Sequence, residues 1–126
     1  MIVGLGTDIV EIPRIGRIIE RHGELFLNRV FTDDEIRYCQ HRKESYPHFA
    51  GRWCAKEAVM KVLGTGFMWG VGWRDIEITN ERSGKPHVTL HGGALDLADG
   101  MDVDRMLISI SHCRAYATAT AIATRG

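Results

Sequence analysis

The sequence predicts an α+β fold in which a strand and several helices come first and an antiparallel sheet wraps around one long central helix. Three observations lead to this prediction. Helical signals fill most of the first half of the chain, strand-like alternation fills the second half, and residues 48–63 form an almost uninterrupted helical stretch. The length of 126 residues is that of a single domain, so we expect one domain over residues 1–126.

The N-terminal segment, residues 2–12, has apolar side chains on both faces of a predicted strand. We therefore expect this strand to be buried on both sides. Pro13 suits the first turn of a helix that follows, and Gly23 suits its end.

Two further helices are marked by their ends. Residues 32–35 read Thr-Asp-Asp-Glu, a capping-box pattern that predicts a short helix to about Arg42. Pro47 starts the next element. The long helix over residues 48–63 is expected to end with a C-cap at the glycines of residues 64–66.

The second half of the chain changes to strand patterns. Strands are predicted at residues 73–79, 87–90, 105–111 and 115–123, a turn at residues 82–86 and a short helix at residues 92–100. In the last strand every second residue is alanine, and these residues share one face: Ala115, Ala117, Ala119, Ala121 and Ala123. A face of alanines lets a helix approach closely.

Composition limits the classes of function. Sixteen Lys and Arg balance sixteen Asp and Glu, which argues against a protein that coats nucleic acid or an anionic membrane. Three cysteines without C-x-x-C spacing argue against a disulfide framework and against a zinc site, and they fit a reducing compartment. No segment is long and apolar enough to span a bilayer. We expect a cytoplasmic protein whose partners are neither nucleic acid nor membrane.

One carboxylate interrupts the apolar first strand. Asp8 shares a face with Gly4, Gly6 and Val10, and no turn lies nearby to expose it. An unpaired buried carboxylate costs several kcal/mol, so Asp8 needs a partner. It could cap a neighbouring helix, pair with an arginine or bind a metal ion, and this residue alone leaves all three open.

A second carboxylate and a lysine form a narrow polar stripe on the long helix. Glu57 and Lys61 lie about 40° apart around the helix axis. An exposed Glu–Lys pair has the same spacing, but this helix is apolar over most of its circumference, so a functional stripe is an equal alternative. Together with Asp8, the two residues match what Mg²⁺ and a phosphate ester require, namely carboxylates for the metal and a cation for phosphoryl oxygens.

Other basic residues could reach an anionic ligand or be simply solvated. Arg52, Lys85 and His112 are of this kind. The histidines lack metal-ligand spacing, and no serine lies in a Gly-x-Ser-x-Gly motif, so zinc and serine hydrolases are disfavoured.

Three arginines follow one another at near-helical spacing after the first strand. Arg14, Arg17 and Arg21 give their helix a basic stripe inside a neutral protein. Such a stripe is either solvated or docks an acidic helical partner.

Four segments of the chain together resemble the holo-[acyl-carrier-protein] synthases, short members of the 4′-phosphopantetheinyl transferase superfamily. They are Gly-Thr-Asp-Ile-Val-Glu-Ile at residues 6–12, Arg-Trp-Cys-Ala-Lys-Glu-Ala-Val-Met-Lys at residues 52–61, Ser-Gly-Lys-Pro at residues 83–86 and Ser-Ile-Ser-His at residues 109–112 before Tyr116 and Ala117. Many family members carry Phe-Ala where this chain has Trp53 and Cys54. The order and spacing of the segments cover nearly the whole chain.

The resemblance implies a Mg²⁺-dependent enzyme with the 4′-phosphopantetheinyl transferase fold. Such an enzyme moves phosphopantetheine from coenzyme A to a serine of an acidic acyl carrier protein in fatty acid biosynthesis and releases adenosine 3′,5′-bisphosphate. By position, Asp8 and Glu57 would bind the metal, and Lys61 would lie beside the phosphates. These three would be the catalytic residues, with the immediate base either Glu57 or a water molecule.

The resemblance also implies binding surfaces. The expected nucleotide-binding residues are Arg52, Lys61, Ser83, Gly84, Lys85, Pro86 and His112. The helix that carries Arg14, Arg17 and Arg21 would dock the carrier protein, and the family is usually a homotrimer with sites between subunits. Two alternatives stay open: a transferase of broader specificity for polyketide or peptide synthetases, and a non-catalytic oligomeric module that binds coenzyme A.

Overall fold

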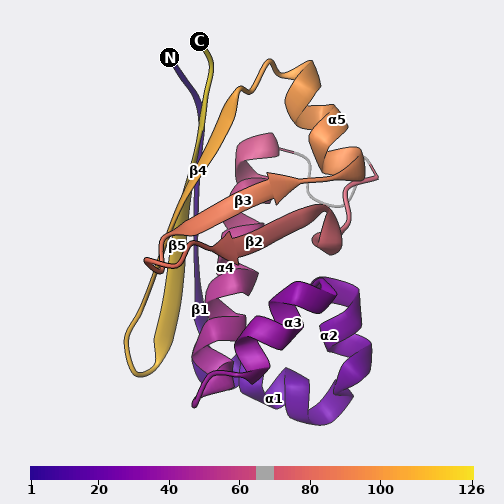
Figure 1. Ribbon diagram of the computed structural model, residues 1–126, viewed down its shortest axis with the longest axis vertical. Helices are drawn as coiled ribbons and strands as arrows, with labels where there is room; N and C mark the ends of the chain where they lie inside the picture. The colour runs from indigo at the N-terminus through magenta and orange to yellow at the C-terminus, as the bar shows by residue number, and fades with distance from the viewer. Residues whose placement is uncertain (65–69) are drawn as a thin grey trace.

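The computed structural model describes residues 1–64 and 70–126. In chain order the elements are β1 (Ile2–Glu11), α1 (Ile12–His22), α2 (Glu24–Val30), α3 (Asp33–Gln40), α4 (Ser45–Leu63), a 3₁₀ turn (Trp73–Asp75), β2 (Ile76–Asn80), β3 (Pro86–Leu90), α5 (Gly92–Gly100), β4 (Arg105–His112) and β5 (Tyr116–Thr124). Helix α4 runs beside the three long strands, with α1–α3 at one end of the molecule and α5 at the other (Figure 1). The predicted α+β class is confirmed.

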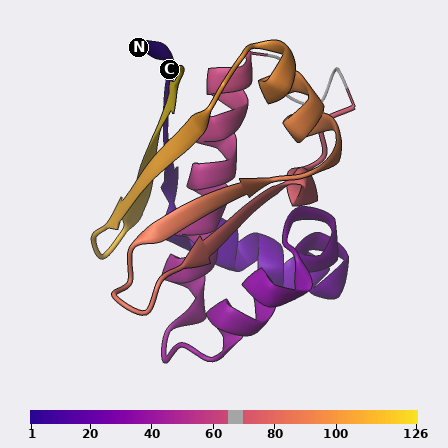
Figure 2. The ribbon, with the colours of Figure 1, turned by 45° about the horizontal axis from the view of Figure 1, so that its top comes forward.

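The long strands form an antiparallel sheet in the order β1-β5-β4. The N-terminal strand therefore pairs with the last strand of the chain, and the two termini lie side by side (Figure 2). The second sheet is the β2–β3 hairpin, which passes over α4 on the side away from β1. The sequence predicted these strands but not their division into two sheets.

The alanine face of β5 packs against α4, as predicted, except that Ala115 precedes the strand and is exposed. Ala117, Ala119, Ala121 and Ala123 are at most 1% exposed. On the neighbouring β1, a Cβ atom added to Gly6 would lie 2.1 Å from the carbonyl oxygen of Ala58 in α4. Glycine and alanine therefore stand where the helix and the sheet approach each other closely.

The opposite face of this sheet differs from the prediction for β1. Ile2, Leu5 and Ile9 are 64–66% exposed, so β1 is buried on one side only. The reason is topological, because α4 covers one face of the three-stranded sheet and no described element of the chain covers the other. Leu5 lies in register with Ile122 of β5, which in turn pairs with Leu107 of β4, so an apolar row crosses all three strands.

A buried ion pair joins α3, α4 and β2. Lys56 Nζ on α4 lies 2.8 Å from Glu35 Oε1, and it donates hydrogen bonds to the carbonyl oxygens of Trp73 and Ile76. Glu35 accepts a further bond from the backbone N–H of Ile78. Burial lowers the pKa of Lys56, whereas the Glu35 carboxylate opposes that shift. Lys56 therefore fixes the position of α4 against its neighbours.

The helix ends show how well local signals predict this chain. The capping box is present, with Glu35 N–H donating to Thr32 Oγ1 and Thr32 N–H donating to Glu35 Oε1. Gly64 caps α4 in the left-handed conformation, whereas Thr65 and Gly66 lie outside the described residues.

The three cysteines are free, as expected. Among the described residues, no helix is both long and apolar enough to cross a bilayer.

The differences from the sequence prediction occur at short elements. Helix α2 was not predicted, because it has only seven residues and follows the glycine at which α1 ends. Helix α4 begins at Ser45, three residues before the predicted start, with Pro47 inside its first turn. Residues Trp73–Asp75 form a 3₁₀ turn instead of the start of strand β2.

Candidate functional site

Asp8, Glu57 and Lys61 meet where β1 crosses α4. Asp8 lies on the face of β1 that packs against the helix, opposite Ala119 of β5. Lys61 Nζ is 3.2 Å from Asp8 Oδ1 and donates a hydrogen bond of 2.9 Å to the carbonyl oxygen of Thr7. Lys61 therefore pairs with a carboxylate on another element, and the described structure contains no Glu57–Lys61 ion pair. The observed partner of Asp8 is thus a lysine, which was not among the partners considered from the sequence, and the described residues include no arginine paired with it.

Glu57 is partly buried beside this pair. Burial raises the pKa of Glu57, and the negative charge of Asp8 raises it further, while Lys61 opposes the change. Lys61 thus pairs with Asp8 and acts on Glu57 only through its charge. Because like charges at close range oppose ionisation, a cation placed between them would be stabilised.

Cys54 lies one turn before Glu57 and contacts the same site. Its thiol donates a hydrogen bond of 3.3 Å to the carbonyl oxygen of Ala117. Burial raises the pKa of Cys54 to about 12, and Asp8 adds to this shift. Cys54 is therefore a neutral packing group and not a nucleophile.

The donor set at this site fits magnesium better than zinc. Within the described residues no group of three or more His, Cys, Asp or Glu side chains is arranged to hold a metal ion. Mg²⁺ does not need such a cage, because one or two carboxylates suffice when water and substrate phosphates supply the other ligands. Asp8 and Glu57 supply two carboxylates, and the pKa of Glu57 is raised first by burial and then by the negative charge of Asp8.

A second site is a pocket of about 220 Å³ between α3, α4, the β2–β3 turn and the end of β4. Its lining includes four of the predicted nucleotide-binding residues, Arg52, Gly84, Pro86 and His112. Residues Tyr38, His48 and Asn80, among others, complete the wall. Ser83 and Lys85 are exposed within the β2–β3 turn and do not line this pocket, and Lys61 belongs to the carboxylate site.

Arg52 is a buried cation in the lining of the pocket. The residue is 4% exposed, its guanidinium group lies 4.1 Å from the centroid of the Tyr38 ring, and it donates a hydrogen bond to Asn80 Oδ1. Asn80 Nδ2 in turn donates 2.9 Å to the carbonyl oxygen of Gly84, which connects the turn to the arginine. Arg52 Nε has no hydrogen-bond partner among residues 1–64 and 70–126. A buried charged N–H without a partner is unfavourable, so this geometry favours an anionic ligand.

The arginines of the basic stripe neither line the Arg52 pocket nor pair with Asp8. Arg14, Arg17 and Arg21 are all exposed on α1 (Ile12–His22), and none of them forms an ion pair with any described residue. Figure 1 shows α1 at the same end of the molecule as the first turns of α4. The stripe is free for a partner, as the hypothesis requires.

Three residues near these sites were not identified from the sequence. Cys54 contacts Asp8, Asn80 bridges Arg52 to the turn, and His48 faces the pocket. Only His48 carried a usable signal, since it precedes Arg52 by four residues and so lies on the same side of the helix. The role of Asn80 depends on long-range packing, which no local pattern reveals.

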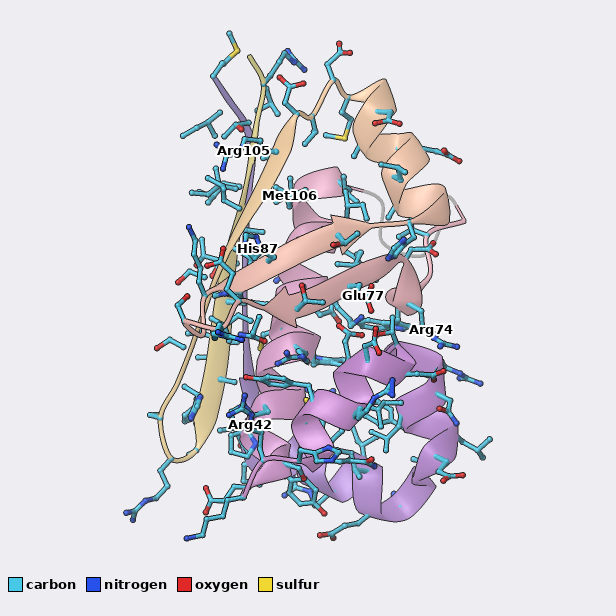
Figure 3. The ribbon with its side chains drawn as sticks, in the orientation of Figure 1. Arg42, Arg74, Glu77, His87, Arg105 and Met106 are labelled. Carbon is cyan, nitrogen blue, oxygen red and sulfur yellow. The ribbon has the colours of Figure 1, made fainter. Side chains whose placement is uncertain are left out.

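A side chain of β2 also connects the two-stranded sheet with the helical end. Glu77 on β2 accepts a hydrogen bond of 2.7 Å from Thr32 Oγ1 at the start of α3, and Figure 3 shows Glu77 close to the helical part of the molecule. Burial opposes ionisation of Glu77, but hydrogen bonds from Thr32 and His91 lower its pKa overall. This contact helps to hold α3, which carries Tyr38, in place.

Comparison with known proteins gives consistent matches over the whole chain. A family model described as the 4′-phosphopantetheinyl transferase superfamily matches residues 4–121. A holo-[acyl-carrier-protein] synthase of Protochlamydia amoebophila is 50% identical over 122 residues, which cover 97% of this chain and 98% of that protein.

Solved structures give the same result. The crystal structure of holo-[acyl-carrier-protein] synthase from Neisseria meningitidis is 32% identical, with a TM-score of 0.89 over 99% of this chain and 100% of that one. The Helicobacter pylori synthase in complex with coenzyme A is 29% identical, with a TM-score of 0.84 over 95% of this chain and 99% of that one.

The raised pKa of Glu57 predicts a pH-dependent effect on stability. A carboxyl group whose pKa is raised by folding stabilises the folded state below its unfolded pKa, and that contribution is lost as the pH rises through the folded pKa. The variant Glu57→Gln has no carboxyl group at this position, so its stability does not fall in this way as the pH rises. In metal-free buffer we expect a higher thermal midpoint than wild type at neutral pH, and a difference that shrinks as the pH falls toward about 4.

Scanning calorimetry of the two proteins with a chelator present measures this difference. Asp96→Asn, at an exposed position of α5, is the matched control and is expected to leave the midpoint nearly unchanged. An equal midpoint for Glu57→Gln and wild type at neutral pH would show that the repulsion at this site is unimportant.

Proposed function

The chain belongs to the 4′-phosphopantetheinyl transferase superfamily, and we propose that it transfers 4′-phosphopantetheine from coenzyme A to a serine of apo acyl carrier protein. The other product is adenosine 3′,5′-bisphosphate. The observation that carries the proposal is the meeting of Asp8, Glu57 and Lys61 between β1 and α4. Support also comes from a relative named holo-[acyl-carrier-protein] synthase, which matches this chain over 98% of its own length. A structural neighbour described in complex with coenzyme A adds to this support.

Asp8 and Glu57 are the proposed metal ligands. When bound, Mg²⁺ supplies positive charge that neutralises the pyrophosphate oxygens of coenzyme A. Lys61 lies beside Asp8 with its ammonium group half exposed, so it can contact phosphoryl oxygens as a point charge. These residues orient the pyrophosphate and place little demand on covalent catalysis.

Glu57 is also the proposed base. The acceptor serine oxygen attacks the phosphorus next to the pantetheine arm, and the bond from that phosphorus to the bridging oxygen of the pyrophosphate breaks. Glu57 accepts the serine proton, directly or through a water molecule. Its raised pKa supports this role, because a base works best when its pKa approaches the operating pH.

The pocket at Arg52 is the proposed binding site for the nucleotide end of coenzyme A. Arg52 and His112 supply cationic or donor groups, and Gly84 and Pro86 supply the turn that closes one side. Ser83 and Lys85 lie exposed in the same turn, where they can contact the ligand from outside the pocket. The unpaired Arg52 Nε supports an anionic ligand here.

A homotrimer with shared sites is part of the proposal. The apolar row of Leu5, Ile122 and Leu107 on the uncovered sheet face supports association of copies. Arg52 and Glu57 are five residues apart on α4 and so about 140° apart around its axis, which places the pocket and the carboxylates on different sides of the helix. A site shared between copies would join the pocket of one copy to the carboxylates of another.

Sedimentation equilibrium of the full chain is expected to give the mass of three copies, and a monomer at micromolar concentration would contradict this.

We place this activity in fatty acid biosynthesis in the cytoplasm. The neutral overall charge, balanced over 16 basic and 16 acidic residues, supports a soluble protein partner in preference to nucleic acid or an anionic membrane. A broader transferase for polyketide or peptide synthetases is the alternative enzyme, and the match to a holo-[acyl-carrier-protein] synthase over 98% of that protein favours the narrower activity.

Mass spectrometry of the carrier protein tests the reaction itself. Incubation of the chain with apo acyl carrier protein, coenzyme A and Mg²⁺ is expected to add the mass of phosphopantetheine to the carrier. Asp8→Ala and Glu57→Ala are each expected to abolish transfer without unfolding the protein, because each removes a metal ligand. No mass gain with the wild-type chain, while a control transferase is active, would overturn the proposal in favour of a non-catalytic module.

The basic stripe predicts a selective effect on one substrate. Arg14→Glu or Arg17→Glu is expected to raise the KM for carrier protein by tenfold or more, about 1.4 kcal/mol, because repulsion replaces attraction to an acidic partner. The KM for coenzyme A is expected to stay nearly constant. Steady-state kinetics with each substrate varied in turn measures both constants, and the reverse pattern would place the docking surface elsewhere.

A further inference from the structure

The pocket at Arg52 contains several hydrogen-bond donors that lack partners. Arg52 Nε is buried and unpaired. Among the described residues, no hydrogen-bond partner lies at either ring nitrogen of His48 or of His112, and both rings line the same pocket. None of the described residues in its lining is acidic. These groups together favour an anion that accepts several hydrogen bonds.

His48 occupies a central place in this pocket. It lies on α4 one turn before Arg52, so both side chains project from the same side of the helix. Its ring contacts the Tyr38 ring of α3 and the His112 ring of β4, each with a centroid distance of 6.1 Å. His48 therefore stands where three elements meet around the cavity.

The titratable groups around His48 are nearly all basic. Arg42 precedes α4 and lies with its guanidinium carbon 4.2 Å from the centroid of the Tyr38 ring (Figure 3 labels Arg42). Arg52 comes from α4 and His112 from β4, and the β2–β3 turn contributes no titratable group to the pocket lining. Burial lowers the pKa of His48, and Arg42, Arg52 and His112 lower it further. In the empty pocket the imidazole is therefore mostly neutral at pH 7.

We propose that His48 determines specificity for the 3′-phosphate of coenzyme A and takes up a proton from solvent when this phosphate monoester enters the pocket. This inference rests on the proposed function. The pyrophosphate is assigned to Asp8 and Glu57, so the 3′-phosphate is the remaining anionic group of coenzyme A. A dianion beside the imidazole favours its protonated form, which then donates from both ring nitrogens.

The expected pH dependence has a definite sign. Binding raises the pKa of His48, so affinity for the 3′-phosphate is greatest at low pH and falls as the pH rises through the range between the free and bound pKa values. A shift of one pKa unit changes affinity by about tenfold. Affinities are compared only above about pH 6.5, because the phosphate monoester itself takes up a proton near pH 6.

Isothermal titration calorimetry of the full chain tests this proposal. Coenzyme A and 3′-dephospho-coenzyme A are titrated in buffers of low and high ionisation enthalpy, from about pH 6.5 to about pH 8.5. For wild type we expect proton uptake with coenzyme A but not with the dephospho compound, and a several-fold fall in the affinity ratio of the two ligands across this range. His48→Gln is expected to lose the uptake and to make the ratio independent of pH.

Two further variants keep the test specific. His22→Gln, at an exposed position at the end of α1, is the matched control and is expected to behave like wild type. Proton uptake that persists in His48→Gln, or that disappears only in His112→Gln, would overturn the assignment. Should coenzyme A bind with proton uptake while no carrier protein gains mass, the transferase proposal fails and the recognition of the 3′-phosphate by His48 stands.

Discussion

The backbone contact between β1 and α4 is the constraint on which the rest of this structure depends. Gly6 leaves no room for a side chain, because a Cβ atom there would meet the carbonyl oxygen of Ala58 and the Cβ of Lys61. The alanine face of β5 continues the same flat surface. This close approach brings Lys61 within reach of Asp8 and buries part of Glu57 beside it. Small residues thus determine the position of the charged ones.

Helix α4 serves two sites because its polar side chains project from different sides. Glu57 and Lys61 face β1, whereas His48 and Arg52 face α3 and the β2–β3 turn. The buried Lys56–Glu35 pair holds the helix at this orientation; breaking one partner of such a pair typically costs about 3–5 kcal/mol. A single chain therefore presents a carboxylate site and an anion pocket that face different neighbours, an arrangement that favours a site shared between copies.

Much of the fold and of the carboxylate site could be predicted from local sequence. The capping box, the glycine after Leu63 and the alternation of β5 are local signals, and the structure confirms each of them. The carboxylates were recognisable because a charge in an apolar strand or helix needs a partner. The features that could not be predicted depend on long-range packing. The exposed face of β1 depends on where α4 packs. The bridge from Asn80 to Arg52 joins residues 28 positions apart in the sequence.

The approach of β1 to α4 creates the proposed metal site by placing Asp8 beside Glu57. Electron paramagnetic resonance of Mn²⁺, used as a probe for Mg²⁺ with coenzyme A present, measures it most directly in wild type and in Gly6→Ala. The variant retains Asp8 and Glu57 but forces β1 away from Ala58. Gly100→Ala, where an added Cβ meets nothing within 4 Å, is the control. We predict that folded Gly6→Ala binds Mn²⁺ at least about tenfold more weakly than wild type and the control. Equal affinity in all three proteins would contradict the account.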